Sequence, residues 1–188
     1  MAKLACLLLA SLTLLQGCAV LLVGAGVGTA SVAHDRRSLG TQLDDTTLSN
    51  RVSLAISNNT ELNKNARVNV EVFNGSVLLI GQTPTEQLRN TAEQVARGVP
   101  QVEKIHNQLR VATPVAASTI THDVWLANKV RAVLVADARI DGLNINVSVE
   151  DSEVFLMGMV SNKEADIAVE IVRNINGVAR VVKAFEIQ

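Results

Sequence analysis

Aromatic residues are nearly absent from this chain of 188 residues, which has no Tyr, one Trp and three Phe. Because its hydrophobic share is nonetheless 48%, any core must be built from Val, Leu, Ile and Ala. A chain this poor in aromatic residues also lacks platforms on which nucleic-acid bases could stack. The formal net charge of −1 lacks the positive excess that binding to a phosphate backbone requires. We therefore expect no nucleic-acid partner.

Cysteine is also scarce. Cys6 and Cys18 are the only two, and both lie near the N-terminus, which argues against a disulfide framework or a cysteine metal cluster. The three His residues show no ligand spacing with Asp or Cys, and no Ser-His-Asp or Cys-His arrangement stands out. We therefore predict no catalytic residues, no metal, no cofactor and no small-molecule substrate, so that the protein is not an enzyme.

Residues 1–17 have the features of a secretory signal, with Lys3, the apolar run Leu4–Leu15 and small residues before Cys18. This run is too short to span a bilayer as a helix. The alternatives are an ordinary signal peptide, or a longer transmembrane segment that continues into the glycine-containing stretch after Cys18. The sequence Leu15-Gln16-Gly17-Cys18 resembles a bacterial lipobox. That resemblance implies that Cys18 is acylated and becomes the first mature residue. It also implies a lipid-anchored protein sorted to the outer membrane and facing the periplasm.

The rest of the chain is an internal duplication. Val77-Leu-Leu-Ile-Gly81 recurs as Val154-Phe-Leu-Met-Gly158, and the alternating apolar residues before these segments recur with them. A short stretch with Pro and small residues separates the two copies. We therefore predict a signal peptide at 1–17, a lipidated Cys and tether at 18–43, and a first domain at 44–111. A linker at 112–120 and a second domain at 121–188 follow.

Each copy shows the pattern of a helix, two strands joined by a tight turn, a second helix and a last strand. This predicts an α+β fold of two tandem α-β-β-α-β units, each with a three-stranded mixed sheet covered by two helices on one face. The second helices are expected to open with capping boxes at Thr83–Glu86 and Ser161–Glu164. The pair Asp44-Asp45 is expected to cap the first helix. Since each unit is small, we expect the two to pack against each other.

The predicted helix Asp123–Ala136 differs from its counterpart in the first unit. One stripe of it is apolar where the first unit is mostly polar, and it holds Val124, Trp125, Ala132 and Val135. Lys129 and Arg131 flank that stripe, which suits a helix lying on an anionic membrane surface. The opposite face, which includes Val130, is predicted to pack the core. The alternative is that Trp125 and Val135 pack against the first unit.

Two such units, each with a glycine closing the second strand, resemble BON domains. With the lipobox and the tether Arg37–Asp45, the chain resembles the dual-BON outer-membrane lipoproteins of Gram-negative bacteria. That resemblance implies a protein that supports outer-membrane integrity, is found at division sites, and binds anionic phospholipid, chiefly phosphatidylglycerol, through the first helix of its second BON domain. The implied lipid-binding residues are Trp125, Asn128, Lys129, Val130, Arg131 and Val135. The alternative function is a non-enzymatic periplasmic adaptor that acts through protein partners in outer-membrane protein assembly or cell-wall remodelling.

Overall fold

The computed structural model describes residues 36–188, so the signal peptide, Cys18 and most of the predicted tether lie outside the described residues. The two repeats use the same order of elements, to which α5 and the short 3-10 helix η1 are unpredicted additions. The first repeat consists of α4 (Leu39–Asn58), α5 (Thr60–Asn65), β1 (Arg67–Phe73), β2 (Ser76–Thr83), α6 (Glu86–Arg97) and β3 (Lys104–Val111). The second consists of α7 (Ala117–Ala136), η1 (Gly142–Asn144), β4 (Asn146–Glu150), β5 (Glu153–Val160), α8 (Asn162–Arg173) and β6 (Arg180–Ile187).

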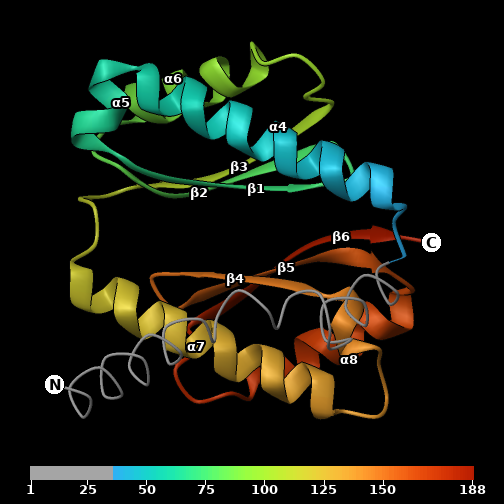
Figure 1. Cartoon of the computed structure of the whole chain (residues 1–188). Coiled ribbons are helices and arrows are strands. Elements are labelled where there is room, and N and C mark those ends of the chain that lie inside the picture. The colour runs from blue at the N-terminus through green and yellow to red at the C-terminus, as the bar shows by residue number, and fades with distance from the viewer. Residues whose placement is uncertain (1–35) are drawn as a thin grey trace, which may run out of the picture. The chain divides into compact units, whose positions relative to one another are not determined.

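Each repeat forms one mixed three-stranded sheet. β1 pairs antiparallel with β2, which pairs parallel with β3. The second repeat has the same topology in β4, β5 and β6. α4 and α6 cover one face of the first sheet, and α7 and α8 cover the matching face of the second (Figure 1). The predicted fold of two α-β-β-α-β units is therefore confirmed.

The first helix of each repeat begins earlier than predicted. α4 begins at Leu39, inside the predicted tether, because Ser38 accepts a hydrogen bond from the backbone N–H of Thr41 and caps the helix. α7 begins at Ala117, so the last residues of the predicted linker 112–120 are helical. No side chain caps its start. Both helices are therefore longer, and each exposes more outer surface, than the sequence pattern indicated.

The second helices confirm one predicted capping box and correct the other. Ser161 and Glu164 form the reciprocal pair of hydrogen bonds at the start of α8. In the first repeat the predicted box at Thr83–Glu86 is wrong, because Thr85 caps α6 by accepting from the backbone N–H of Leu88. β2 extends to Thr83, so the helix starts two residues later than the pattern suggested.

A buried aspartate in the first helix of each repeat holds the strand turn. Asp45 is 5% exposed and accepts hydrogen bonds from the backbone N–H groups of Asn74 and Gly75 at 2.7 and 2.9 Å. Asp123, 4% exposed, binds the turn Asp151–Ser152 in the same way. All four turn residues have positive φ, which matches a tight two-residue hairpin turn. The expectation that Asp45 caps the first helix is therefore wrong, because Asp45 lies inside α4 and its carboxylate links the helix to the sheet.

The second face of each sheet packs on the other repeat. Phe73, Leu78 and Ile80 of the first sheet contact Phe155 and Met157 of the second, in a cluster whose members are at most 4% exposed. Burial of a large apolar side chain contributes roughly 1.5–3 kcal/mol. Because the sheets cover each other, the helices of residues 36–188 lie on the outside (Figure 1).

A buried carboxylate joins the sheets beside this apolar cluster. Glu150 in β4 is 4% exposed. It accepts hydrogen bonds from Arg67 Nε at 2.9 Å, Asn69 Nδ2 at 2.7 Å and Gln82 Nε2 at 3.0 Å. All these donors belong to the first repeat. Since a buried charge is tolerated only with partners, this arrangement selects one register in which the two sheets meet.

The residues just before α4 contact both repeats. The Arg36 guanidinium donates to the carbonyl oxygen of Met159 at 3.1 Å and pairs with Glu164 at 2.8 Å, both in the second repeat. Arg37 lies over the Phe73 ring of the first repeat, with 4.1 Å from Cζ to the ring centroid. The chain that enters α4 is therefore held by both repeats.

The ion pair between Arg36 and Glu164 is sensitive to acid. The hydrogen-bonded Arg36 guanidinium and the donors of Ser161 lower the pKa of Glu164 from 4.5 to about 2. A carboxyl with a depressed folded pKa stabilises the fold above its unfolded pKa and loses that contribution as the pH falls through its folded pKa. We expect Glu164→Gln to destabilise the protein at pH 7 and to have a much smaller effect near pH 2, where Glu164 is about half protonated in the folded protein and fully protonated in the unfolded chain. Urea unfolding at the two pH values measures this, and an equal effect at both would contradict it.

Candidate membrane-binding surface

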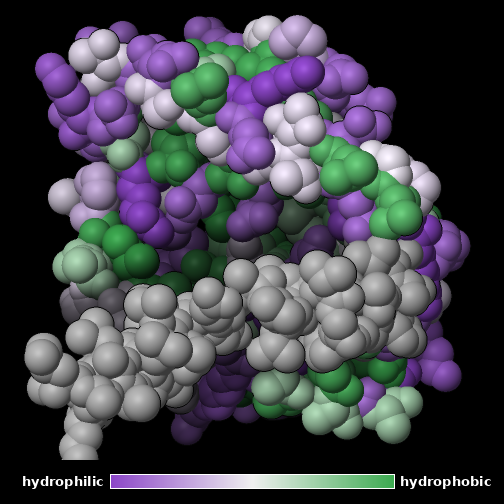
Figure 2. All heavy atoms as spheres, in the orientation of Figure 1, coloured by the Kyte–Doolittle hydropathy of each residue, from purple (hydrophilic) through white to green (hydrophobic). Residues whose placement is uncertain are grey.

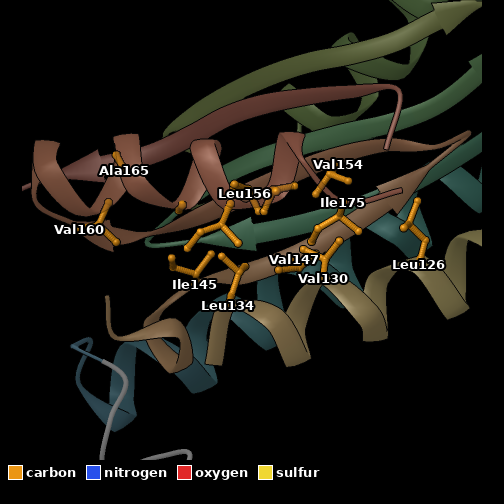
Figure 3. Packing of buried hydrophobic residues seen from close by; sticks show 13 residues of the cluster. Leu126, Val130, Leu134, Ile145, Val147, Val154, Leu156, Val160, Ala165 and Ile175 are labelled. Atoms are coloured by element: carbon orange, nitrogen blue, oxygen red, sulfur yellow. The ribbon is translucent and has the colours of Figure 1, made fainter. Parts of the chain in front are cut away.

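α7 carries every residue predicted for lipid contact. Its inner side packs on β4, β5 and α8 through Leu126, Val130 and Leu134, each 0% exposed (Figure 3). η1 closes against the C-terminal end of the helix, where a Cβ added to Gly142 would lie 2.4 Å from the Leu134 backbone. These contacts fix the rotation of α7 about its axis and thus decide which residues face outward.

Large apolar side chains stand on the outer side of α7. Val124, Trp125 and Val135 are 58%, 56% and 52% exposed, and Asn128 and Ala132 are exposed with them. Val124 and Val135 each line a hollow together with residues of the first repeat, including Glu71, whereas Trp125 lines neither hollow. The alternative in which Trp125 packs against the first repeat is therefore wrong.

Val130 is the one predicted contact that does not face outward. It belongs to the core cluster of the second repeat together with Leu126 and Leu134. The helical position of Val130 had already placed it on the core face, and the resemblance had placed it among the lipid contacts. The structure corrects the second of these, so Val130 supports the fold of the domain and is not available to a lipid.

Two cations border the apolar stripe on opposite sides. Lys129 Nζ lies 5.0 Å from the centroid of the Trp125 ring and donates to the carbonyl oxygen of Asn176 at 3.1 Å. Arg131 donates from Nη1 to Asn128 Oδ1 at 3.1 Å and from Nη2 to the carbonyl oxygen of Val147 at 2.6 Å. Within residues 36–188, neither cation pairs with a carboxylate. Both charges are positioned by hydrogen bonds to neutral groups.

His122 belongs to this surface, although the sequence pattern did not single it out. Its ring lies 5.8 Å from the Trp125 ring, tilted by 42°, and its side chain is 46% exposed. The three-residue spacing from Trp125 would have indicated this contact if the helix had been extended back past Asp123. The contact was missed because the predicted helix began at Asp123, one residue after His122.

A hollow of about 420 Å³ opens beside Arg131. Val135 and Leu143 line its apolar side, and Glu71 and Ser148 line its polar side. Ser148 Oγ donates to Glu71 Oε1 at 2.5 Å, so the carboxylate is already occupied. The negative charge of Glu71 disfavours an anionic group beside it in the hollow, whereas Arg131 favours one.

Both repeats match a single family model, that of the BON domain, over residues 44–113 and 122–188. This chain belongs to the BON domain family. The two repeats are hereafter BON1 and BON2, and the exposed stripe of α7 lies on the first helix of BON2.

Similar proteins cover between 77% and 96% of the chain. The "Outer membrane lipoprotein DolP" of Haemophilus influenzae is 38% identical over 180 residues, which is 96% of this chain and 93% of that protein. The "21 kDa hemolysin" of Actinobacillus pleuropneumoniae is 38% identical over 149 residues, 79% of this chain and 77% of that protein. One similar solved structure is the C-terminal domain of CdsD, a structural protein of the type III secretion system of Chlamydia trachomatis. The match covers 77% of this chain and 67% of that chain, with 18% sequence identity and a TM-score of 0.30.

The remaining features to consider are the lipidation site, metal ligands and membrane-spanning helices. The predicted lipidation site, Cys18, lies outside residues 36–188. Within those residues no three His, Cys, Asp or Glu side chains group as metal ligands would. No helix of this part of the chain is sufficiently long and apolar to span a bilayer.

Proposed function

We propose that this protein is an outer-membrane lipoprotein, anchored through Cys18, whose BON2 domain lies on anionic phospholipid through the outer side of α7. The observation that carries the proposal is the exposed stripe with Trp125 at its centre and Lys129 and Arg131 at its edges. Such a stripe fits the boundary between headgroups and acyl chains. The sequence before Cys18 and the similarity to DolP, an outer membrane lipoprotein by name, support the anchor.

The distribution of acidic residues favours BON2 over BON1 for this contact. The only acidic residue of α7 is Asp123, which is buried beneath the hairpin turn. The outer side of α7 therefore presents no carboxylate to repel a negatively charged surface. In α4 the position of Trp125 is taken by Thr47, and Asp44 is exposed.

The size of the stripe predicts weak docking that depends on lipid composition. Each cation near an anionic surface contributes about 1 kcal/mol, and each apolar side chain contributes roughly 1.5–3 kcal/mol at best. An anchored protein needs no more than this, because the anchor raises the local concentration of the domain at the bilayer. Phosphatidylglycerol is the lipid that the resemblance to dual-BON lipoproteins implies. We propose that docking supports outer-membrane integrity, at division sites.

Replacing Trp125 tests this proposal. We expect Trp125→Glu to weaken co-sedimentation with phosphatidylglycerol-containing vesicles about tenfold or more, because it removes a large apolar contact and adds a negative charge. In the unchanged protein, fluorescence of the single Trp should shift to the blue on titration with these vesicles but not with phosphatidylcholine alone.

Val111→Glu is the matched control, since Val111 is 45% exposed on BON1. It should bind vesicles as the unchanged protein does. If Trp125→Glu retains full vesicle binding while the fold is intact, an adaptor that works only through protein partners explains the chain better.

A further inference from the structure

The outer side of α4 holds exposed leucines that docking through α7 does not use. Leu39, Leu43 and Leu54 are 61%, 70% and 61% exposed. At roughly 100° per residue they fall within about 60° of one another, opposite the fully buried Val52. Figure 2 shows apolar side chains spaced along α4 among polar neighbours. These leucines form a stripe, which we call the α4 stripe.

The surroundings of the α4 stripe do not suit an anionic bilayer. Its charged neighbours, Asp44 and Arg51, cancel, and it has no aromatic residue.

The arrangement of residues along α4 is symmetric about its middle. The midpoint between Leu43 and Leu54 in the sequence lies close to residue 48, and so does the midpoint between Asp44 and Arg51. Asp44 and Arg51 lie on one flank of the helix, at about 280° and 260° when Val52 is set to 0°. A helix with this pattern is complementary to itself when a second copy runs antiparallel to it.

We propose that the α4 stripe binds the α4 stripe of a second copy of this chain, in an antiparallel pair related by a two-fold axis. In this pair Leu43 of one copy contacts Leu54 of its partner, and each such contact occurs twice. Asp44 of each copy faces Arg51 of the other. Thr47 and Asn50 meet near the axis, where polar side chains define the register.

The pair is weak by its size. A single helix pair buries less than the roughly 1,200 Å² typical of a stable complex, so association depends on the high local concentration that membrane anchoring provides. α4 and α7 cover the outer faces of different sheets (Figure 1). Pairing through α4 and docking through α7 are therefore separate events, and each can be tested without the other.

A photo-crosslinking side chain at position 54 of the full chain, in its native membrane, tests the pair. We expect a product of twice the chain mass, reduced at least fivefold by Leu43→Glu, which removes the partner's contact. The same probe at position 111 should give no such product. A probe at position 54 that yields no product, or reacts only with lipid or with another protein, would overturn the proposal.

Charge reversal tests the antiparallel orientation. Asp44→Arg and Arg51→Asp should each lower the yield of the product about threefold to tenfold, because exposed ion pairs become like-charge pairs. The two together should restore it. Arg51 donates to Gln101 Oε1 at 2.8 Å within its own chain, and Arg51→Asp also removes this bond. Gln101→Ala removes this bond alone and is therefore the control. Unchanged thermal unfolding shows that each variant folds, and a double variant no better than the singles would overturn the pair.

Discussion

Glu150→Ala lowers the free energy of unfolding by about 2–4 kcal/mol, because it removes the acceptor of the side chains that join BON1 to BON2. The Nε2 donor of Gln82, a residue that is 1% exposed, is left without its acceptor, and only Gln82 Oε1 keeps a bond, from the Val115 backbone N–H. Arg67, whose side chain is 28% exposed, recovers part of its solvation from water. For a protein of this length the thermal midpoint should fall by about 5–15 °C. Urea and thermal unfolding of the full chain measure the change.

Two variants bracket this result. Glu150→Gln keeps the shape and one acceptor oxygen, so we expect an intermediate loss. Glu186→Ala removes an exposed bond between the repeats, in which Asn74 Nδ2 donates to Glu186 at 2.8 Å, and should change stability by less than about 0.5 kcal/mol. If Glu150→Ala and Glu186→Ala cost the same, the buried network does not hold the repeats together.

Gly81→Ala is the substitution with the largest expected cost to BON1. Gly81 has a φ of +127°, and a Cβ there would lie 2.1 Å from the carbonyl oxygen of Arg67 on the neighbouring strand. Backbone strain of about 1–3 kcal/mol adds to about 1–3 kcal/mol for forcing the strands apart. We expect a loss of about 2–6 kcal/mol in unfolding free energy, measured by urea unfolding.

Gly98→Ala is the matched control within BON1. Its φ is −73° and its nearest neighbour to an added Cβ is 3.5 Å away. An alanine at such a site is tolerated, and it stabilises by about 0.4–1 kcal/mol through the unfolded chain. Similar losses at both positions would show that close strand approach is not what Gly81 provides.

The repeat marked Gly81 and Gly158 as special positions, but the sequence pattern did not predict why glycine is needed there. Gly81 and Gly158 were expected to end their strands, whereas β2 and β5 continue to Thr83 and Val160. The repeated motif marks a place where two backbones approach closely inside the sheet. Alternation and helical spacing could predict the order of elements, because both depend on local patterns. Backbone proximity depends on pairing across strands, which those patterns do not contain.

The outward face of α7 was predictable to the extent that helical periodicity decides it. Periodicity placed Trp125 and Val135 on one side and Val130 on the other, and the structure agrees. It could not decide whether Trp125 faces the other repeat or solvent, because that depends on how two sheets meet. The pattern also missed His122, since α7 has no capping side chain to mark its start at Ala117.

The contacts of Arg36 and Arg37 determine how a mechanical load would pass through the protein. Arg36 is fastened to BON2 at Met159 and Glu164, and Arg37 is packed on Phe73 of BON1. A pull on the N-terminal side of residue 36 is therefore shared between the two domains before it reaches α4. When an envelope is stretched, BON1 and BON2 bear the force as one body. One contact on this path, the ion pair between Arg36 and Glu164, is also the one that acid weakens.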